Sequence, residues 1–466
     1  MDSFGIALIG CGTVGSGVAK LLLEQSDRLA ARAGRRLELR HVVVRDAGKR
    51  RDVPIPDALL TTDMRRVIDD PKVEVAVEVV GGIDWARKTI LDLLAAKKHI
   101  VTANKELLAT HGAEIFDAGR RHGRAIAFEA SVGCGIPIIG ALCQGLAANQ
   151  ILSLQGILNG TSNYILTGMT ENGQAYADVL KEAQRKGYAE ADPTFDVDGT
   201  DAAHKLAILV QIAFGVAVPL SAIRRRGIAD IDQLDIRFAK ELGYTIKLLA
   251  EAWFDAHPLT PDPSPPAGRG DKGSPLTPDP SPPAGRGETL ALHVSPVMLR
   301  QNSPLALVRD AYNALFVLGD AVGSTLYYGR GAGQMPTASA VVADIIDMAV
   351  GRAQQTFRSL KLWSGDHPHI AVRDPATMRT RFYLRMMVED RPGVMADITR
   401  ILANHHISIS SVIQHEALDH ADEEIEIVPL IIMTHTVTTG SFQAAMHEID
   451  RLSSVRPPSV CFPVGD

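Results

Sequence analysis

The chain has 466 residues, of which 46% are hydrophobic and 5% aromatic, and its formal net charge is -6. This composition is typical of a globular protein with two or three domains, and the mildly acidic balance argues against nucleic acid or a membrane as the main partner. The four cysteines show no metal-binding or disulfide spacing, and neither a secretory leader nor a membrane-spanning apolar run is evident. We therefore expect reduced thiols and a cytoplasmic location.

The first 130 residues have the pattern of a dinucleotide-binding domain. Residues 4–9 form a short apolar strand that leads through Gly10, Gly12 and Gly15 into a helix, which is the G-x-G-x-x-G fingerprint in its strand–turn–helix context. The three glycines allow a tight turn, close approach of a pyrophosphate and close packing of the helix on the strand. Further strands alternate with helices and predict a parallel, doubly wound sheet, with strands at 37–44, 73–80, 99–103 and 125–129.

Two basic features bear on the cofactor. The strand at 37–44 is followed by Arg45 and then by the basic run 49–51. This cluster suits the 2′-phosphate of NADP, which is our first choice, while NAD or a merely solvated run of charge stays open. Lys105 follows the strand at 99–103, at the sheet edge where ligands bind, and the alternative for it is a surface lysine.

A glycine-rich loop runs from Glu129 to Pro137. It exposes backbone carbonyl groups and adds one carboxylate, a set of oxygen donors that suits a hard monovalent cation. A purely structural turn is the alternative. Cys134 lies in this loop without an evident histidine partner, so we expect it to pack rather than react.

The stretch 187–205 carries five carboxylates and one amine within sixteen residues, namely Glu190, Asp192, Asp196, Asp198, Asp201 and Lys205. Asp192-Pro193 should end the helix expected to run through 176–186, and an apolar helix should begin near 198–201. Because Asp201 and Lys205 are four residues apart, they share one helix face near its positive end. We expect the chemistry here, and the alternative is an acidic loop followed by an ordinary salt bridge. Upstream, a strand at 155–158 leads into a helix for which Thr161 or Ser162 is the expected N-cap.

Two strands at 248–254 and 289–295 are expected to pair in an antiparallel hairpin. Between them a thirteen-residue sequence occurs twice, at 258–270 and 275–287, and its Pro, Gly, Ser and Asp content predicts a disordered insertion at 258–287. A proline-rich binding segment is the alternative. After two more strands, the glycine-rich stretch 329–333 opens a helix that reaches residue 350, which predicts a second anion site at a helix start.

The last part of the chain, from residue 381, shows a β-α-β-β-α-β order of elements. It begins with an alternating strand over 381–388, and the turn at 389–394 leads into an amphipathic helix. Two strands, a second helix and a short final strand follow.

Six motifs resemble, in order, those of the monofunctional bacterial homoserine dehydrogenases: GCGTVG, TANK, FEASVGxGIP, LNGTSNYIL, GYAEADPTxDVDGxDAAHK and YYGRGAG. The terminal β-α-β-β-α-β segment resembles an ACT domain, with DRPGVMADI as its ligand-loop signature. The resemblance implies an α/β protein of three parts. They are a Rossmann-type doubly wound NAD(P)-binding domain (1–130, with a return helix at about 331–350), an α+β catalytic and dimerisation domain (131–330), and, after a linker (351–380), an ACT regulatory domain (381–466).

The resemblance further implies interconversion of L-aspartate 4-semialdehyde and L-homoserine, on the way to threonine, methionine and isoleucine. The implied catalytic residues are Lys205, Asp201 and Lys105, with Lys205 as proton donor and acceptor. The implied substrate-binding residues are Glu190, Asp201 and Asp196. The implied cofactor-binding residues are Gly10, Gly12, Thr13, Val14, Gly15, Arg45, Lys105, Gly187, Gly331 and Gly333. A monovalent cation such as Na+ would bind at Glu129, Val132, Cys134 and Ile136, although the family usually has glycine in place of Cys134.

The implied partners are the small-molecule substrate, a second or further copies in a homodimer or homotetramer, and threonine as an effector at the ACT domain. An ACT domain that dimerises without sensing is the alternative. A non-catalytic nucleotide- and amino-acid-sensing regulator is the rival function, and the presence of Lys205, Asp201 and Glu190 argues against it. A phosphorylating semialdehyde dehydrogenase would need an activated Cys–His pair, which is not found.

Overall fold

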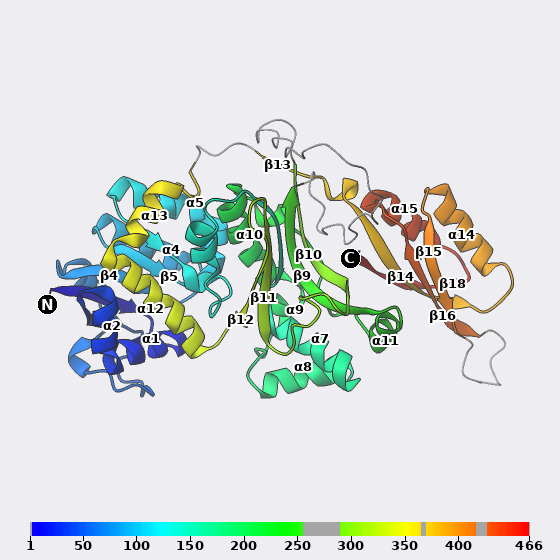
Figure 1. Cartoon of the computed structure of the whole chain (residues 1–466). Helices are drawn as coiled ribbons and strands as arrows, with labels where there is room; N and C mark the ends of the chain where they lie inside the picture. The colour runs from blue at the N-terminus through cyan, green and yellow to red at the C-terminus, as the bar shows by residue number, and fades with distance from the viewer. Residues whose placement is uncertain (1, 255–288, 365–369, 416–425, 466) are drawn as a thin grey trace, which may run out of the picture.

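The computed structural model describes residues 2–254, 289–364, 370–415 and 426–465. The proline-rich repeat at 258–287 lies outside these residues. The chain forms three parts in a row, with the N-terminal domain at the left of Figure 1, a sheet with its helices in the middle and the C-terminal domain at the right. None of the helices that the structure describes combines the length and apolar character of a bilayer span.

The N-terminal domain is built on a parallel sheet, as predicted, and the short strand β3 brings its strands to six. Its strand order is β3-β2-β1-β4-β5-β6. The strands are β1 (Ser3–Ile9), β2 (Arg36–Val43), β3 (Leu60–Thr61), β4 (Val73–Glu78), β5 (His99–Thr102) and β6 (Ile126–Ala127). The helices are α1 (Thr13–Glu24), α2 (Ser26–Ala33), α3 (Arg65–Ile68), α4 (Asp84–Ala95) and α5 (Lys105–His122). The strand expected at 125–129 is shorter, because the chain turns at Glu129–Ser131.

The helix α12 (Gln334–Val350) returns to this domain from far along the chain and packs on α1. The approach is close, since a β-carbon on Gly17 would lie 2.9 Å from the β-carbon of Ala338. Glycine at that position therefore lets the two helices meet. The helix α12 corresponds to the return helix expected at about 331–350.

The central part is an antiparallel arrangement of β12, β11, β7, β9 and β10, covered by helices. Its strands are β7 (Ile151–Ile157), β9 (Tyr244–Phe254), β10 (Thr289–Arg300), β11 (Tyr312–Gly319) and β12 (Gly323–Arg330), with the short β8 (Arg224–Arg225) beside β10. Its helices are α6 (Ile138–Gly140), α7 (Gly160–Asn172), α8 (Tyr176–Arg185), α9 (Thr194–Val197), α10 (Thr200–Phe214) and α11 (Gln233–Glu241). The predicted hairpin is confirmed, because β9 pairs antiparallel with β10.

The C-terminal domain has the predicted β-α-β-β-α-β order. It consists of β14 (Arg379–Glu389), α14 (Val394–Asn404), β15 (Ile409–Gln414), β16 (Ile427–Thr434), α15 (Thr439–Ile449) and β18 (Val455–Gly465), with a two-residue strand β17 (Val437–Thr438). The sheet order is β18-β14-β16-β15. Phe382 of β14 stacks on Phe442 of α15 with ring centroids 3.9 Å apart, so strand and helix share one core.

Two connections between the parts were not anticipated. β18 pairs in parallel with β10, through Met298 with Val464 and Leu299 with Gly465, so the central and C-terminal sheets are continuous. The region expected as a linker also holds structure, since it contains α13 (Arg352–Leu360) and β13 (Ala371–Val372). Trp363 from this region packs on Phe116 of the N-terminal domain, with centroids 4.5 Å apart.

Candidate active site

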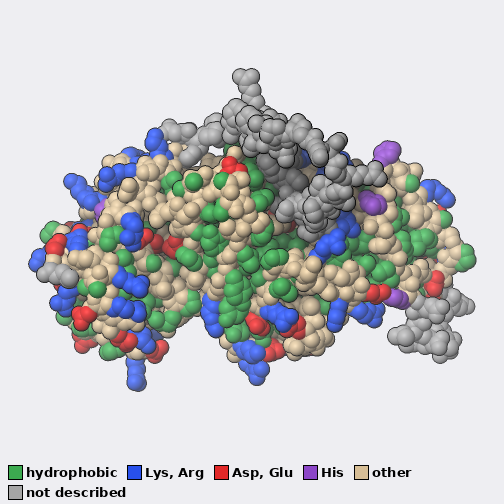
Figure 2. Space-filling model, viewed as in Figure 1, with side chains coloured by type: hydrophobic (Ala, Val, Ile, Leu, Met, Phe, Trp, Pro, Cys, Tyr) green, Lys and Arg blue, Asp and Glu red, His purple; other side chains and the backbone are tan. Residues whose placement is uncertain are grey.

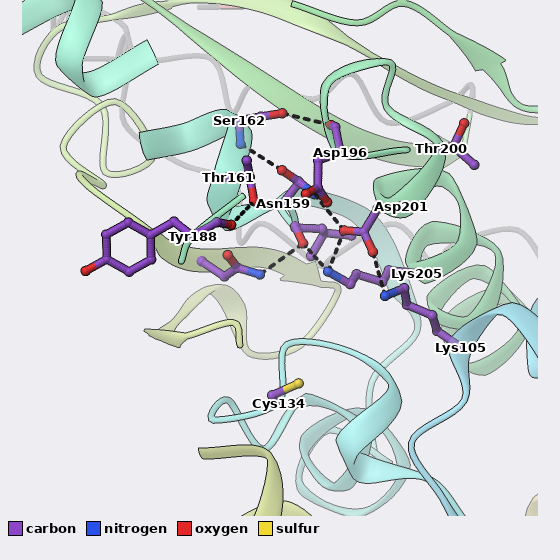
Figure 3. A network of polar contacts seen from close by, with 12 residues as sticks. Lys105, Cys134, Asn159, Thr161, Ser162, Tyr188, Asp196, Thr200, Asp201 and Lys205 are labelled. Atoms are coloured by element: carbon purple, nitrogen blue, oxygen red, sulfur yellow. Dashed lines mark hydrogen bonds and ion pairs between the residues drawn. The ribbon is translucent and has the colours of Figure 1, made fainter. Parts of the chain in front are cut away.

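The first turn of α10 brings an acid and an amine together in a buried position. Gly199, with a φ of 85°, precedes the helix, and Asp201 and Lys205 follow one turn apart. The Lys205 Nζ lies 2.7 Å from Asp201 Oδ2 and donates to the Leu158 carbonyl at 2.6 Å (Figure 3). Only 9% of the Lys205 side chain is exposed, so its position is well defined by these two acceptors.

A second lysine reaches the same carboxylate from the other domain. Lys105 is the first residue of α5, directly after β5, and its Nζ lies 2.9 Å from Asp201 Oδ1. Its side chain is 40% exposed, in contrast to that of Lys205. Asp201 is thus held between two ammonium groups, one from each side of the domain junction. The three residues for which the resemblance implies a catalytic role therefore lie together.

The charges of this group follow from its contacts. Burial by itself would raise the pKa of the Asp201 carboxyl, but Lys205 and Lys105 outweigh burial and hold that pKa well below its usual range. Desolvation would lower the pKa of Lys105, yet the carboxylate of Asp201 raises it instead. Asp201 is therefore an anion and Lys105 a cation at neutral pH.

Asn159 is a residue that the sequence analysis missed. It is the N-cap of α7, because its Oδ1 accepts from the Ser162 backbone N–H at 2.8 Å. The expectation that Thr161 or Ser162 is the cap is therefore wrong. The Asn159 amide also donates to Asp201 Oδ2 at 2.8 Å and to Asp196 Oδ1 at 2.7 Å, so one side chain orients both acids. An Asn after a strand and before a helix is a recognised N-cap signal that would have indicated it.

The hydroxyl groups first considered as caps serve the neighbouring loop instead. The Thr161 hydroxyl donates to the Tyr188 carbonyl at 2.7 Å, and the Ser162 hydroxyl donates to the Asp196 carbonyl at 2.9 Å. These bonds tie the loop that follows α8 to the start of α7, as Figure 3 shows. They place Gly187, which has a φ of 76°, one residue from a fixed carbonyl.

The other acids of the stretch 187–205 divide into two groups. Burial raises the pKa of Asp196, against the hydrogen bond from Asn159. Asp192 and Asp198 accept bonds from Thr194 and Thr200 two residues ahead, so they stabilise local turns. The Glu190 side chain is exposed and makes no hydrogen bond to the described residues, and its substrate-binding role stays a prediction.

Asn313, which precedes no recognisable motif, is a second missed residue. Its amide donates to the Leu158 carbonyl at 3.0 Å, the same oxygen that Lys205 uses. A β-carbon on Gly331 would lie 2.0 Å from the Asn313 amide nitrogen. Glycine at 331 thus lets the chain pass close to the group that positions the Lys205 acceptor. Gly333, at a φ of 119°, then starts α12 without a side-chain cap.

The glycine turn before α1 has the geometry that a dinucleotide requires. Gly10 has a φ of 98°, and a β-carbon on Gly15 would lie 2.1 Å from the Gly10 carbonyl oxygen. A β-carbon on Gly12 would meet no atom within 4 Å, so the space beside it is open. The helix begins at Thr13 and Val14 without a side-chain cap or an acid in its first turn, which leaves backbone N–H groups for a phosphate.

The basic segment after β2 is only partly available to a ligand. Arg51 donates to the carbonyls of Asp46 at 2.6 Å and Lys49 at 2.7 Å, so it holds its own loop. The Asp46 carboxylate accepts from the Gly48 backbone N–H at 2.8 Å. Arg45 is exposed and forms no such bond among the described residues. Arg45 is therefore open to a cofactor, as are the exposed side chains of Lys49 and Arg50.

The loop predicted to hold a cation offers oxygen donors. The carbonyls of Val132 and Cys134 accept no hydrogen bond from the described residues, whereas that of Ile136 accepts from Ile138 at 2.8 Å. The Glu129 carboxylate accepts from the N–H groups of Ile139 at 2.9 Å and Gly140 at 2.7 Å, and burial raises its pKa. No cluster of three or more His, Cys, Asp or Glu side chains suited to a metal occurs in the part of the chain that the structure describes. A cation here would thus depend on the free carbonyls, and the donor set fits one.

Cys134 adopts a φ of 34°, a left-handed conformation that is uncommon outside glycine. Its Sγ donates weakly to the Ala130 carbonyl at 3.4 Å, in line with the expected packing role.

Comparison with known proteins gives consistent results over the whole chain. Three family models match: "Homoserine dehydrogenase, NAD binding domain" over residues 10–129, "Homoserine dehydrogenase" over 137–346 and "ACT domain" over 382–453. The homoserine dehydrogenase of Synechocystis is 40% identical over 459 residues, 98% of each chain, and that of Bacillus subtilis is 37% identical over 460 residues, 98% of this chain and 97% of the relative. A crystal structure of a homoserine dehydrogenase from Thiobacillus denitrificans matches with a TM-score of 0.83 and 39% identity, over 100% of this chain and 99% of the other.

Proposed function

The chain belongs to the homoserine dehydrogenase family, and from that premise we propose that Lys205 is the group that moves the proton in its reaction. The protein is an oxidoreductase that interconverts L-aspartate 4-semialdehyde and L-homoserine with a nicotinamide cofactor. The observation that carries the proposal is the Asp201 carboxylate held between Lys205 and Lys105. The test is replacement of Lys205, which is argued in the Discussion.

The proposed role of Lys205 follows from charge. The nicotinamide ring, when bound, gives or takes the hydride at the carbon that carries the substrate oxygen. Negative charge then grows on that oxygen, and a neighbouring ammonium stabilises it and donates a proton. Asp201, fixed by Asn159, keeps the Lys205 ammonium in place. Lys105 adds a second positive charge from the cofactor domain, while Asp196 and Glu190 are proposed to hold the substrate ammonium.

We also propose that NADP is the preferred cofactor, because Arg45 is exposed and unpaired among the described residues. In the Arg45→Glu variant, KM for NADP should rise by about tenfold or more, since a charge-assisted hydrogen bond is lost and repulsion is added. KM for NAD should change much less. Steady-state kinetics with both cofactors measure this. Arg28→Glu makes the same change at an exposed residue of α2 and should leave both values as they were.

We propose that a monovalent cation such as Na+ is held by the carbonyls of Val132 and Cys134, with Glu129 and Ile136 beside them. Two open carbonyls next to a carboxylate give the negative potential that such an ion needs.

A homo-oligomer is the proposed assembly. Strand β12 is an edge of the sheet, and Leu326 and Tyr328 on it are 44% and 55% exposed. Figure 2 shows hydrophobic side chains at the surface in the middle of this face, where Figure 1 places β11 and β12. An unpaired edge with apolar side chains is a favourable surface for a second copy.

Threonine is the proposed effector at the ACT domain. Gly393 precedes α14 with a φ of 100° and leaves its first N–H groups without a side-chain cap, which suits a carboxylate. Titration calorimetry should give heat of threonine binding, and homoserine oxidation should fall in parallel. Neither heat nor inhibition at millimolar threonine would leave a domain that only dimerises.

A further inference from the structure

A cavity of about 520 Å³ lies between the central sheet and the ACT domain. One wall is a face of β9 and β10, with Trp253, His293 and Ser295, and the other comes from the starts of β14 and α15 and the end of β18. In Figure 1 the strands β9, β10 and β14, which contribute to the cavity lining, lie in other parts of the molecule than α1 and the glycine turn before it.

The lining of this cavity is strongly basic. Six of its residues are arginines, namely Arg224, Arg225, Arg226, Arg373, Arg379 and Arg381, and the acid among the described lining residues is Glu251. Glu251 is already engaged, because its Oε2 lies 3.0 Å from His293 Nε2 and its Oε1 accepts from Gln155 at 2.9 Å. This single carboxylate balances one positive charge of the lining.

The arginines of the central part are held in fixed positions. Arg224 is paired with His293 across β8 and β10, so both side chains lie on the cavity face of the sheet. Its guanidinium faces the side-chain amide of Gln443 from α15. Arg226 donates to the Cys461 carbonyl, and its guanidinium lies 5.1 Å from the centroid of the Phe462 ring. Arg226 also lies 3.2 Å from Asp230 Oδ2 and is therefore ion-paired, whereas the Arg224 guanidinium faces only a neutral amide.

Two further polar side chains of the cavity lining have no hydrogen-bond partner among the described residues. The Arg379 side chain forms no ion pair or hydrogen bond with the described residues. The Ser295 hydroxyl is buried and has no hydrogen-bond partner among them. A convergent set of donors beside buried aromatic carbon is the usual composition of a small-molecule site.

We propose that this cavity binds a phosphorylated small molecule that joins the ACT domain to the central sheet. A guanidinium matches phosphate oxygens in a two-pronged geometry. A phosphate group also carries more than one negative charge near pH 7, which suits the two guanidinium groups of Arg224 and Arg379 better than a single carboxylate does. Trp253, Phe382 and Phe442 offer apolar surface for the rest of such a ligand. Arg224 belongs to the central part and Arg379 to the ACT domain. A ligand bound to both therefore stabilises the contact between these two domains.

The experiment is calorimetric titration of the full chain with pyrophosphate, at saturating nicotinamide cofactor so that the glycine turn is filled. The wild type should bind, and Arg224→Gln with Arg379→Gln should weaken Kd by about tenfold or more, since charge-assisted hydrogen bonds are lost. Arg400→Gln removes the same charge from an exposed site of the same domain and should leave Kd unchanged. Thermal melting checks that each variant is folded. The single variant Arg379→Gln breaks no contact among the described residues, and its Kd for pyrophosphate is measured as well.

Three results would overturn the proposal. They are no heat at millimolar pyrophosphate, an unchanged Kd in both the single and the double variant, and an equal loss in Arg400→Gln. Citrate, which has three carboxylates, is titrated in parallel, and tighter binding of citrate than of pyrophosphate would contradict the assignment to phosphate.

Discussion

Lys205→Met is expected to lose turnover by about a thousandfold or more while it binds the nicotinamide cofactor as the wild type does. General acid–base catalysis and stabilisation of the developing oxyanion each contribute factors on the order of a hundred or more, and one ammonium supplies both. Spectrophotometric assay of homoserine oxidation gives kcat, and cofactor fluorescence gives the binding constant. The fold should survive, because methionine replaces the apolar stem and Asp201 keeps its pair with Lys105 at 2.9 Å.

The matched control for this variant is Lys88→Met. Lys88 is an exposed lysine of α4 in the cofactor domain, so its loss should leave kcat and cofactor affinity as they were. Near-normal turnover in Lys205→Met would remove Lys205 from the chemistry and turn attention to Lys105. Loss of cofactor binding together with turnover would instead assign Lys205 to positioning of the nicotinamide ring.

What the sequence could predict here depends on interactions that are local. The strand, glycine turn and helix at residues 3–24 are recognisable because the tight turn is formed within that segment, where a β-carbon on Gly15 would lie 2.1 Å from the Gly10 carbonyl oxygen. Asp201 and Lys205 could be paired because they lie one turn apart on one helix. Lys105 could be placed at a sheet edge because parallel strands share that edge, but the sequence could not show that it meets Asp201.

The features that sequence reasoning missed depend on contacts between distant segments. Asn159 joins Asp196 and Asp201, some forty residues away, and its capping role alone would not reveal that. The pairing of β18 with β10 involves only two residues on each strand, so the residue pattern of neither strand indicates it. The short helix α9 follows Pro193, where the expectation was only that a helix would end.

Arg385→Met is expected to reduce the free energy of unfolding by about 3–5 kcal/mol, which is the cost of leaving a buried charge without its partner. The Arg385 Nε lies 2.7 Å from Asp235 Oδ1, and its terminal nitrogen lies 3.0 Å from Asp235 Oδ2 and 2.9 Å from Asp232 Oδ2. Asp235, on α11, is fully buried, and the Tyr383 hydroxyl donates to it at 3.2 Å. Arg385 and Tyr383 come from β14, so this pair fastens the ACT domain to the central part. Urea unfolding followed by circular dichroism measures the loss.

Three further measurements separate this cause from a general effect of removing an arginine. Arg400→Met deletes an exposed arginine of α14, whose nearest acid is 3.5 Å away, and should change stability little. Asp235→Leu combined with Arg385→Met should recover much of the loss, because no unpaired charge is then buried. Burial raises the pKa of Asp235 and Arg385 opposes that rise, so in Arg385→Met the folded state takes up a proton there more readily than the unfolded chain. Stability of the variant should therefore fall as the pH rises and recover towards acid. A deficit that is independent of pH and unrelieved in the double variant would show that the guanidinium stabilises the domain contact by packing alone.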